Sequence, residues 1–174
     1  PRGIGYGAAV VAGNVIANNR DFGVALAGFA FTVVERNRIF DNVQGGIDID
    51  LDGPDVDPPT GPNTPTPPMI LSARFDGTAT IIEGFAHFGS ANNVVSWPVA
   101  VELYANTTVD GQGFAEGERL LGTATLDGSS FTLRHEGDLR GRWITGITRQ
   151  RSSFYGGEYA LETTSEFSRP VRVE

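Results

Sequence analysis

The stretch from Gly46 to Met69 reads GIDIDLDGPDVDPPTGPNTPTPPM, and it separates two different sequence patterns. Five aspartates crowd its front half, and seven of the chain's ten prolines lie within it. Because each proline removes a backbone donor and fixes φ, this stretch cannot continue a hydrogen-bonded sheet. We therefore predict a proline-rich joint at 54–68 between two β-rich domains, which occupy 1–53 and 69–174.

The residues before the joint repeat with a period of 23. Asn14–Gly28 (NVIANNRDFGVALAG) aligns with Asn37–Leu51 (NRIFDNVQGGIDIDL), and the same offset aligns Val10–Val11 with Val33–Val34. A fixed period in this range indicates stacked units, none of which can bury its apolar face alone. Each unit holds three short apolar runs separated by Asn, Asp and Gly, which predicts one rung of a right-handed parallel β-helix. The leucine spacing of a leucine-rich repeat is absent.

Polar and small residues recur in the same register. Asn tolerates the left-handed conformation of corners, and its amide can bond the equivalent amide of the next rung. We therefore interpret the recurring asparagines as structural rather than ligand-binding: Asn14, Asn19, Asn37 and Asn42. Gly23 and Gly46 are expected to supply φ values that other residues avoid. Stacked repeats are stable at about three or more copies, so we expect further rungs before Pro1 or a partner over the open end.

The acidic half of the joint suggests a metal site. Apolar and acidic residues alternate in GIDIDLDG, so the two types are expected to face opposite ways: Ile47, Ile49 and Leu51 inward, and Asp48, Asp50 and Asp52 outward. The run also matches the start of a calcium loop, but Pro59 stands where an EF-hand has its bidentate Glu, so an EF-hand is rejected. A looser Ca²⁺ site and a plain solvated acidic edge both stay open. The candidate metal ligands are Asp48, Asp50, Asp52, Asp55 and Asp57.

The composition limits the partners. Of the 174 residues, 40% are hydrophobic and 23 are glycine, as in a folded β protein rich in turns. The net charge of −8 repels phosphate groups and anionic lipids, so we expect no nucleic-acid partner. No apolar run approaches the ~18 residues that a transmembrane segment needs. Without cysteine there is no disulfide framework and no thiolate chemistry.

After Met69, short apolar runs alternate with turns, which is typical of an antiparallel sandwich, and we predict an Ig-like β-sandwich. The predicted strands are Ile70–Phe75, Thr78–Phe88, Val94–Ala105, Arg119–Leu126, Ser130–His135, Trp143–Arg149 and Phe167–Val173. In the third strand Val99, Val101 and Leu103 alternate with other residues, so we expect one buried face.

The sequence shows no catalytic motif. His87 and His135 lack metal-ligand spacing, and no nucleophile elbow, Walker loop or dinucleotide-binding loop occurs. Glu116 and Glu118 can be imagined as a glycosidase pair, but within GFAEGERL they are expected to cap a turn. We therefore expect no enzymatic activity.

The chain contains the phrases DVDPPTGPNTPTPPMILSA (Asp55–Ala73), ELYANTTVDGQGFAEGERLLGTATL (Glu102–Leu126) and TTSEFSRPVRV (Thr163–Val173). Together they resemble the C-terminal portion of large bacterial secreted or surface proteins, in which right-handed parallel β-helix repeats precede an Ig-like β-sandwich. The resemblance implies an extracytoplasmic location, in the periplasm, at the cell surface or secreted. It also implies a structural or adhesive role, since most members have no established activity.

Two functions are compatible with these features. The preferred one is a noncatalytic extracytoplasmic module that mediates adhesion or docks onto other proteins of a larger cell-envelope assembly. The alternative is the C-terminal fragment of a polysaccharide-active β-helix enzyme, a lyase or glycosidase, with a carbohydrate-binding role. Asp48 and Asp50 beside Arg36 or Arg38 would then mimic the metal site of calcium-dependent lyases of that fold.

Overall fold

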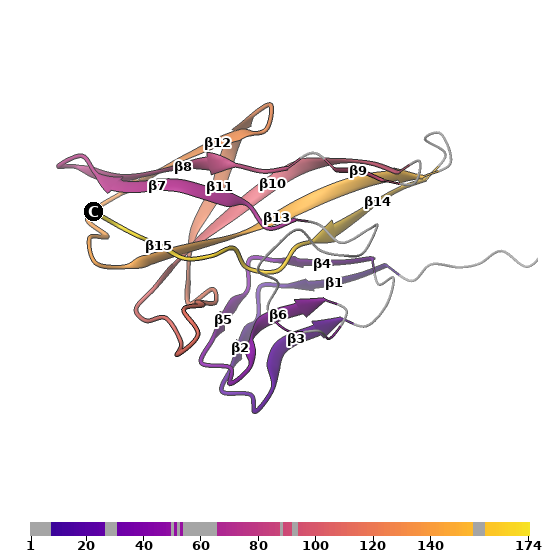
Figure 1. Cartoon of the computed structure of the whole chain (residues 1–174), viewed down its shortest axis with the longest axis horizontal. Helices are drawn as coiled ribbons and strands as arrows, with labels where there is room; N and C mark the ends of the chain where they lie inside the picture. Colours follow the sequence, from indigo (N-terminus) through magenta and orange to yellow (C-terminus); the bar gives the residue numbers. More distant parts are fainter. Residues whose placement is uncertain are drawn as a thin grey trace, which may run out of the picture.

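The computed structural model describes residues 8–26, 31–49, 51, 53, 66–87, 89–91, 94–154 and 159–174. Within these ranges every regular element is a β-strand, and none forms a helix that could cross a membrane. Figure 1 shows two parts, the stacked strands β1 to β6 and a larger sheet of strands β7 to β15 that lies over them. The predicted fold class, all-β with parallel β-helix rungs followed by an antiparallel part, is confirmed.

The stacked strands form two rungs. The first rung (residues 8–26) contains β1 (Ala8–Ala12), β2 (Val15–Ala17) and β3 (Phe22–Leu26), and the second rung (residues 31–49) contains β4 (Phe31–Glu35), β5 (Arg38–Phe40) and β6 (Gly45–Ile49). The pairs β1 with β4, β2 with β5 and β3 with β6 are all parallel. In every pair the Cα partners lie one repeat apart in sequence, as in Val10 with Val33 and Ile16 with Ile39. The predicted repeat is therefore the physical spacing of the rungs.

The asparagines form ladders between the rungs, which confirms their structural role. The Asn14 backbone N–H and side-chain Nδ2 both donate to Asn37 Oδ1, at 2.9 and 3.1 Å. Asn19 repeats the pattern toward Asn42 Oδ1, at 3.2 and 2.7 Å. Each ladder holds a corner of one rung in register with the same corner of the other.

The left-handed corner positions lie one residue before the asparagines, so that part of the prediction was wrong. Gly13 and Arg36 have φ of 68° and 51°, and Asn18 and Asp41 have φ of 59° and 57°. The members of each pair are again one repeat apart in sequence. The corner conformation is therefore set by the stacking, even where the residue is an arginine or an aspartate.

Gly23 and Gly46 are required for a different reason from the one expected, because neither has a positive φ. A Cβ on Gly23 would lie 2.8 Å from the Gly46 carbonyl oxygen, and a Cβ on Gly46 would lie 2.6 Å from Phe167 Cε2. Both distances are shorter than real Cβ contacts. These glycines permit close packing of the next layer, which in the case of Gly46 is the antiparallel sheet.

The antiparallel part is one continuous sheet that curls into a half-barrel. Its strands are β7 (Met69–Phe75), β8 (Ala79–Phe85), β9 (Gly89–Ala91), β10 (Val94–Asn106), β11 (Arg119–Asp127), β12 (Ser130–Glu136), β13 (Trp143–Phe154), β14 (Tyr159–Thr164) and β15 (Val171–Arg172). They are ordered β14-β13-β10-β11-β12-β8-β7, with β15 paired to β13 and β9 paired to β10. The first six predicted strands match β7, β8, β10, β11, β12 and β13, whereas β9 and β14 were missed and the last predicted strand shrinks to β15.

The sheet has a hydrophobic core inside its curve, and its other face is buried too. Val101 and Leu103 of β10 pack in the inner core with Ile82, Phe131 and other residues. Every residue from Ala100 to Asn106 is buried, including those that alternate with the core residues. The prediction of one buried face was therefore wrong, because the rungs cover the second face of the sheet.

Candidate functional site

The most elaborate site in the described residues is the interface between the second rung and the antiparallel sheet. We call the antiparallel sheet and its connecting segments the sheet side. One hydrophobic cluster contains residues of both parts: Val34, Ile39, Ile47 and Ile49 of the second rung, and Tyr104, Ile147 and Phe167 of the sheet side. The rings of Tyr104 and Phe167 meet edge to face, with centroids 5.5 Å apart. The rung and the sheet are therefore joined by a common apolar core.

Side-chain oxygens of the sheet side accept hydrogen bonds from backbone N–H groups of the second rung. Ile49 N–H donates to Glu166 Oε1 at 2.7 Å, and this contact is buried. Val34 N–H donates to Thr164 Oγ1 at 2.8 Å, also in a buried contact. Without an acceptor, each buried donor would cost about 1–3 kcal/mol of stability.

The two corners of the second rung are bonded in the same way. Arg36 N–H donates to Glu102 Oε2 at 2.7 Å. Asn42 donates from its backbone N–H to Glu116 Oε1 at 2.8 Å and from Nδ2 to Glu116 Oε2 at 2.6 Å. Together with Glu166, these carboxylates replace the acceptors that a third rung would present.

One backbone bridge lies between these side-chain contacts. Ile39 N–H donates to the Gly117 carbonyl at 2.9 Å, and Gly117 N–H donates to the Ile39 carbonyl at 2.7 Å. A Cβ on Gly117 would lie 2.7 Å from Phe167 Cζ, so glycine is needed for this approach. The loop that carries Glu116 thus pairs with β5 as a single antiparallel bridge.

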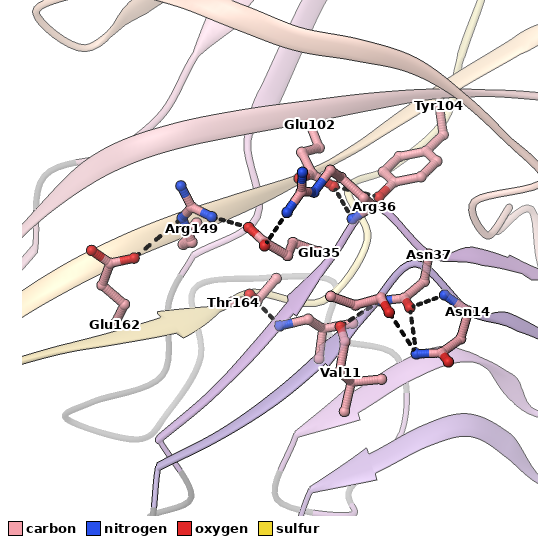
Figure 2. A network of polar contacts seen from close by, with 12 residues as sticks. Val11, Asn14, Glu35, Arg36, Asn37, Glu102, Tyr104, Arg149, Glu162 and Thr164 are labelled. Atoms are coloured by element: carbon pink, nitrogen blue, oxygen red, sulfur yellow. Dashed lines mark hydrogen bonds and ion pairs between the residues drawn. The ribbon is translucent and has the colours of Figure 1, made fainter.

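Figure 2 shows the polar network at the Arg36 corner. Glu102 Oε2 also accepts a hydrogen bond from the Tyr104 hydroxyl at 2.6 Å. Burial, and secondarily the Glu102 charge, raises the pKa of the Tyr104 hydroxyl far above its ordinary value, so this hydroxyl remains a donor. Tyr104 therefore fixes the carboxylate that accepts from the corner.

Ion pairs extend this network along β4, β13 and β14. Glu35 pairs with Arg36 at 2.8 Å and with Arg149 of β13, and Arg149 pairs with Glu162 of β14 at 3.3 Å. The side chains of Glu35, Arg149 and Glu162 are each less than one third exposed. The charges therefore complement one another across the interface between the rung and the sheet.

The segment TTSEFS (residues 163–168) supplies several of the contacts, and all of its residues are buried. Thr164 and Glu166 accept from the rung, and Phe167 packs against it. The remaining serines hold the segment on β13, since Ser165 Oγ accepts from Thr148 N–H at 2.9 Å and Ser168 Oγ accepts from Gly146 N–H at 3.0 Å. Residues facing the rung are thus interspersed with residues anchored to the sheet.

Burial raises the pKa of Glu116 above its ordinary value, and nearby Asp41 and Asp110 add to the shift, while the hydrogen bonds from Asn42 oppose it. A raised folded-state pKa contributes stability at pH values below the unfolded-state pKa of about 4.3, and that stability is lost as pH rises through the folded-state pKa. Glutamine does not titrate, so we expect Glu116→Gln not to lose this stability as pH rises. The difference between variant and wild type, measured by urea unfolding from pH 4 to 7, should therefore shift in favour of the variant as pH rises. A pH-independent difference would contradict the raised pKa.

The predicted metal site is only partly within the described residues. Asp48 lies in β6 and is 1% exposed, with Gly53 N–H donating to its Oδ1 at 3.3 Å. Leu51 is 56% exposed, with a φ of 60°. The expected alternation was therefore wrong at Asp48, which is buried, and at Leu51, which lies exposed in a turn. Asp50, Asp52, Asp55 and Asp57 lie outside the described residues.

No group of three or more His, Cys, Asp or Glu side chains within the described ranges could hold a metal ion. Calcium at the joint stays a prediction, since four of its five candidate ligands lie outside those ranges. The arginines named with Asp48 have other partners: Arg36 pairs with Glu35, and Arg38 Nε donates to the Glu118 carbonyl at 3.1 Å. The lyase-like arrangement requires aspartates on an exposed face of the rung, whereas Asp48 is buried.

Sequence reasoning missed the residues of this interface. Glu118 does bond Thr107, at 2.7 and 2.6 Å, as expected of a turn-capping residue. Glu116, its supposed partner, binds the second rung instead. The one available signal was the acidic residue of TTSEFS among apolar and small neighbours, where a buried carboxylate needs a donor.

Comparisons of this chain with protein-family models, curated proteins and solved structures find no match.

Proposed function

We propose that this chain is a noncatalytic structural module in which the antiparallel sheet caps the end of a parallel β-helix. The end rung of any such stack has backbone donors, carbonyls and apolar side chains that the next rung would otherwise cover. An uncovered strand edge of this kind is a template for aggregation. The cap proposal explains why the second rung is buried by a different kind of structure.

The observation that carries the proposal is the set of acceptors on the sheet side. Glu102, Glu116, Glu166 and Thr164 each accept from a backbone N–H of the second rung, at distances of 2.7 to 2.8 Å. These residues come from three separate segments of the chain. A surface that ends a β-helix must supply acceptors for the backbone donors of the last rung. A general contact between two domains has no such requirement.

The cellular context belongs to the same proposal. The resemblance of the joint and of TTSEFSRPVRV to bacterial secreted or surface proteins supports an Ig-like assignment for the sheet and an extracytoplasmic location. In that setting the capped β-helix would be a structural part of a larger cell-envelope assembly. A calcium ion at the acidic joint would stiffen the connection between rung and cap.

Replacing Thr164 by valine tests the cap at one hydrogen bond. The change keeps the side-chain shape but removes the acceptor of the Val34 N–H, so we expect the free energy of unfolding to fall by about 1–3 kcal/mol. Hydrogen exchange at the Val34 amide should accelerate at least by the factor that is equivalent to this loss of free energy. Thr132→Val, the same change at an exposed position of β12, is the control and should alter neither quantity. Unchanged exchange at Val34 in Thr164→Val would count against a capping role.

A further inference from the structure

The first rung differs from the second in how far its interior is covered. At three inward positions the second rung is buried where the first is only half-buried: Val34 against Val11, Ile39 against Ile16, and Ile49 against Leu26. The corner asparagines show the same contrast, since Asn37 and Asn42 are buried whereas Asn14 and Asn19 are exposed. Equivalent residues thus differ in burial because one rung has a layer on each side and the other, within the described residues, has a layer on one side.

The hydrogen bonds of the asparagines show the same contrast between the two rungs within the described residues. Asn37 Nδ2 donates to the Val11 carbonyl at 2.7 Å, and Asn42 Nδ2 donates to the Ile16 carbonyl at 3.2 Å, so each reaches back to the preceding rung. Asn14 Nδ2 instead donates to the Ala12 carbonyl of its own rung at 3.0 Å, in an exposed contact. A preceding rung would offer Asn14 the same kind of carbonyl that Val11 offers Asn37.

From these observations we infer that the first rung is a docking face for one more parallel β-helical rung, offset by one repeat on its N-terminal side. The inference rests on the proposed function and names what the module is attached to. The existing rung interface defines what the incoming rung must carry. It needs Asn at the two corner columns, to donate to Asn14 Oδ1 and Asn19 Oδ1 as those residues donate to the second rung. It also needs Gly in the column of Gly23, whose Cβ space is filled by the next rung.

A second copy of this chain fits the docking face less well than a further parallel rung. In a two-fold contact the same face meets itself, and the chain of the second copy then winds about the β-helix axis in the opposite direction. The three strand pairs could not all be parallel at one constant offset, so the asparagine ladders and the glycine column could not continue. The parallel register seen in all three strand pairs therefore favours a rung of the same direction.

The test adds such a rung. A variant carries a duplicate of residues 8–30 inserted before Ala8, and a control carries the same inserted residues in shuffled order. A second control keeps the duplicate but replaces its copies of Asn14, Asn19 and Gly23 with leucine, leucine and valine. Hydrogen exchange of the amides of β1, β2 and β3 is followed together with the oligomeric state by light scattering.

We expect the true duplicate to slow exchange in the first rung by at least about tenfold, since local opening then requires separation from a second neighbour. Neither control should do so. Exchange that is equal in all three insertions would overturn the inference. A dimer of the 174-residue chain that the duplicate converts to a monomer would also overturn it, because the occupant would then be a second copy. Either result leaves the cap proposal to stand or fall on Thr164→Val, which concerns the opposite face of the stack.

Discussion

Phe167→Ala is expected to lower the free energy of unfolding by about 3–5 kcal/mol, the range for removing a buried phenylalanine. Phe167 is 8% exposed and lies in the cluster that joins the second rung to the sheet. Its ring fits between Gly46 and Gly117, where a Cβ would come within 2.6 and 2.7 Å of ring atoms. Gly46 lies in β6, which is paired with β3, and the backbone of Gly117 is bonded to Ile39, so we expect the surrounding structure not to collapse into the cavity.

Chemical denaturation followed by the fluorescence of the two tryptophans, Trp97 and Trp143, measures this loss. Phe85→Ala is the matched control, because Phe85 is 41% exposed on β8 and outside the shared cluster. We expect the control to cost less than about 1 kcal/mol, as for most changes away from the core. A loss in Phe167→Ala no larger than that of the control would show that the ring does not hold the rung to the sheet.

The double variant Glu102→Ala/Glu166→Ala is expected to destabilise the chain by at least about 3 kcal/mol, since each of three donors left unpaired costs about 1–3 kcal/mol. The three donors that lose their acceptors are the Arg36 N–H, the Tyr104 hydroxyl and the Ile49 N–H. The two glutamates bond different parts of the second rung, Glu102 the Arg36 corner and Glu166 the last residue of β6, so their effects should largely add. Urea unfolding of the single and double variants measures the sum.

Two controls sharpen this prediction. Glu136→Ala removes an exposed carboxylate on β12, with a side chain 77% exposed, and should change stability by less than about 0.5 kcal/mol. Glu102→Gln/Glu166→Gln keeps one acceptor oxygen on each side chain and should lose less than the alanine pair. Equal losses in the alanine and glutamine pairs would indicate that charge, rather than the hydrogen-bond acceptors, holds the rung.

Much of the fold was predictable because its signals are local. The N-terminal repeat sets the register of all three parallel strand pairs, since stacked strands must place equivalent residues in columns. Most antiparallel strands were predictable because turn residues mark their ends. The ladders of Asn14 with Asn37 and of Asn19 with Asn42 also follow from the repeat alone.

The interface could not be predicted in this way. Its acceptors lie far from their donors in sequence, by 66 residues for Glu102 and Arg36 and by 117 for Glu166 and Ile49. The acidic residue within TTSEFS is a local signal for a buried carboxylate, but it does not identify the distant N–H that Glu166 accepts from. The same limit explains why Asp48 was wrongly predicted to be exposed. Its alternation with isoleucines indicates that it faces outward, but not that other residues cover that face.

Hydrogen exchange at the amides of Val34, Arg36 and Ile49 tests most directly whether the sheet caps the rung. In the wild-type chain we predict that these amides exchange as slowly as the amide of Leu103 in the sheet core, because they open only when the whole protein unfolds. In Glu102→Ala/Glu166→Ala, Arg36 and Ile49 should lose this protection while Val34, held by Thr164, keeps more of it. Wild-type exchange at these amides as fast as in the exposed turn at Gly128 would contradict the cap.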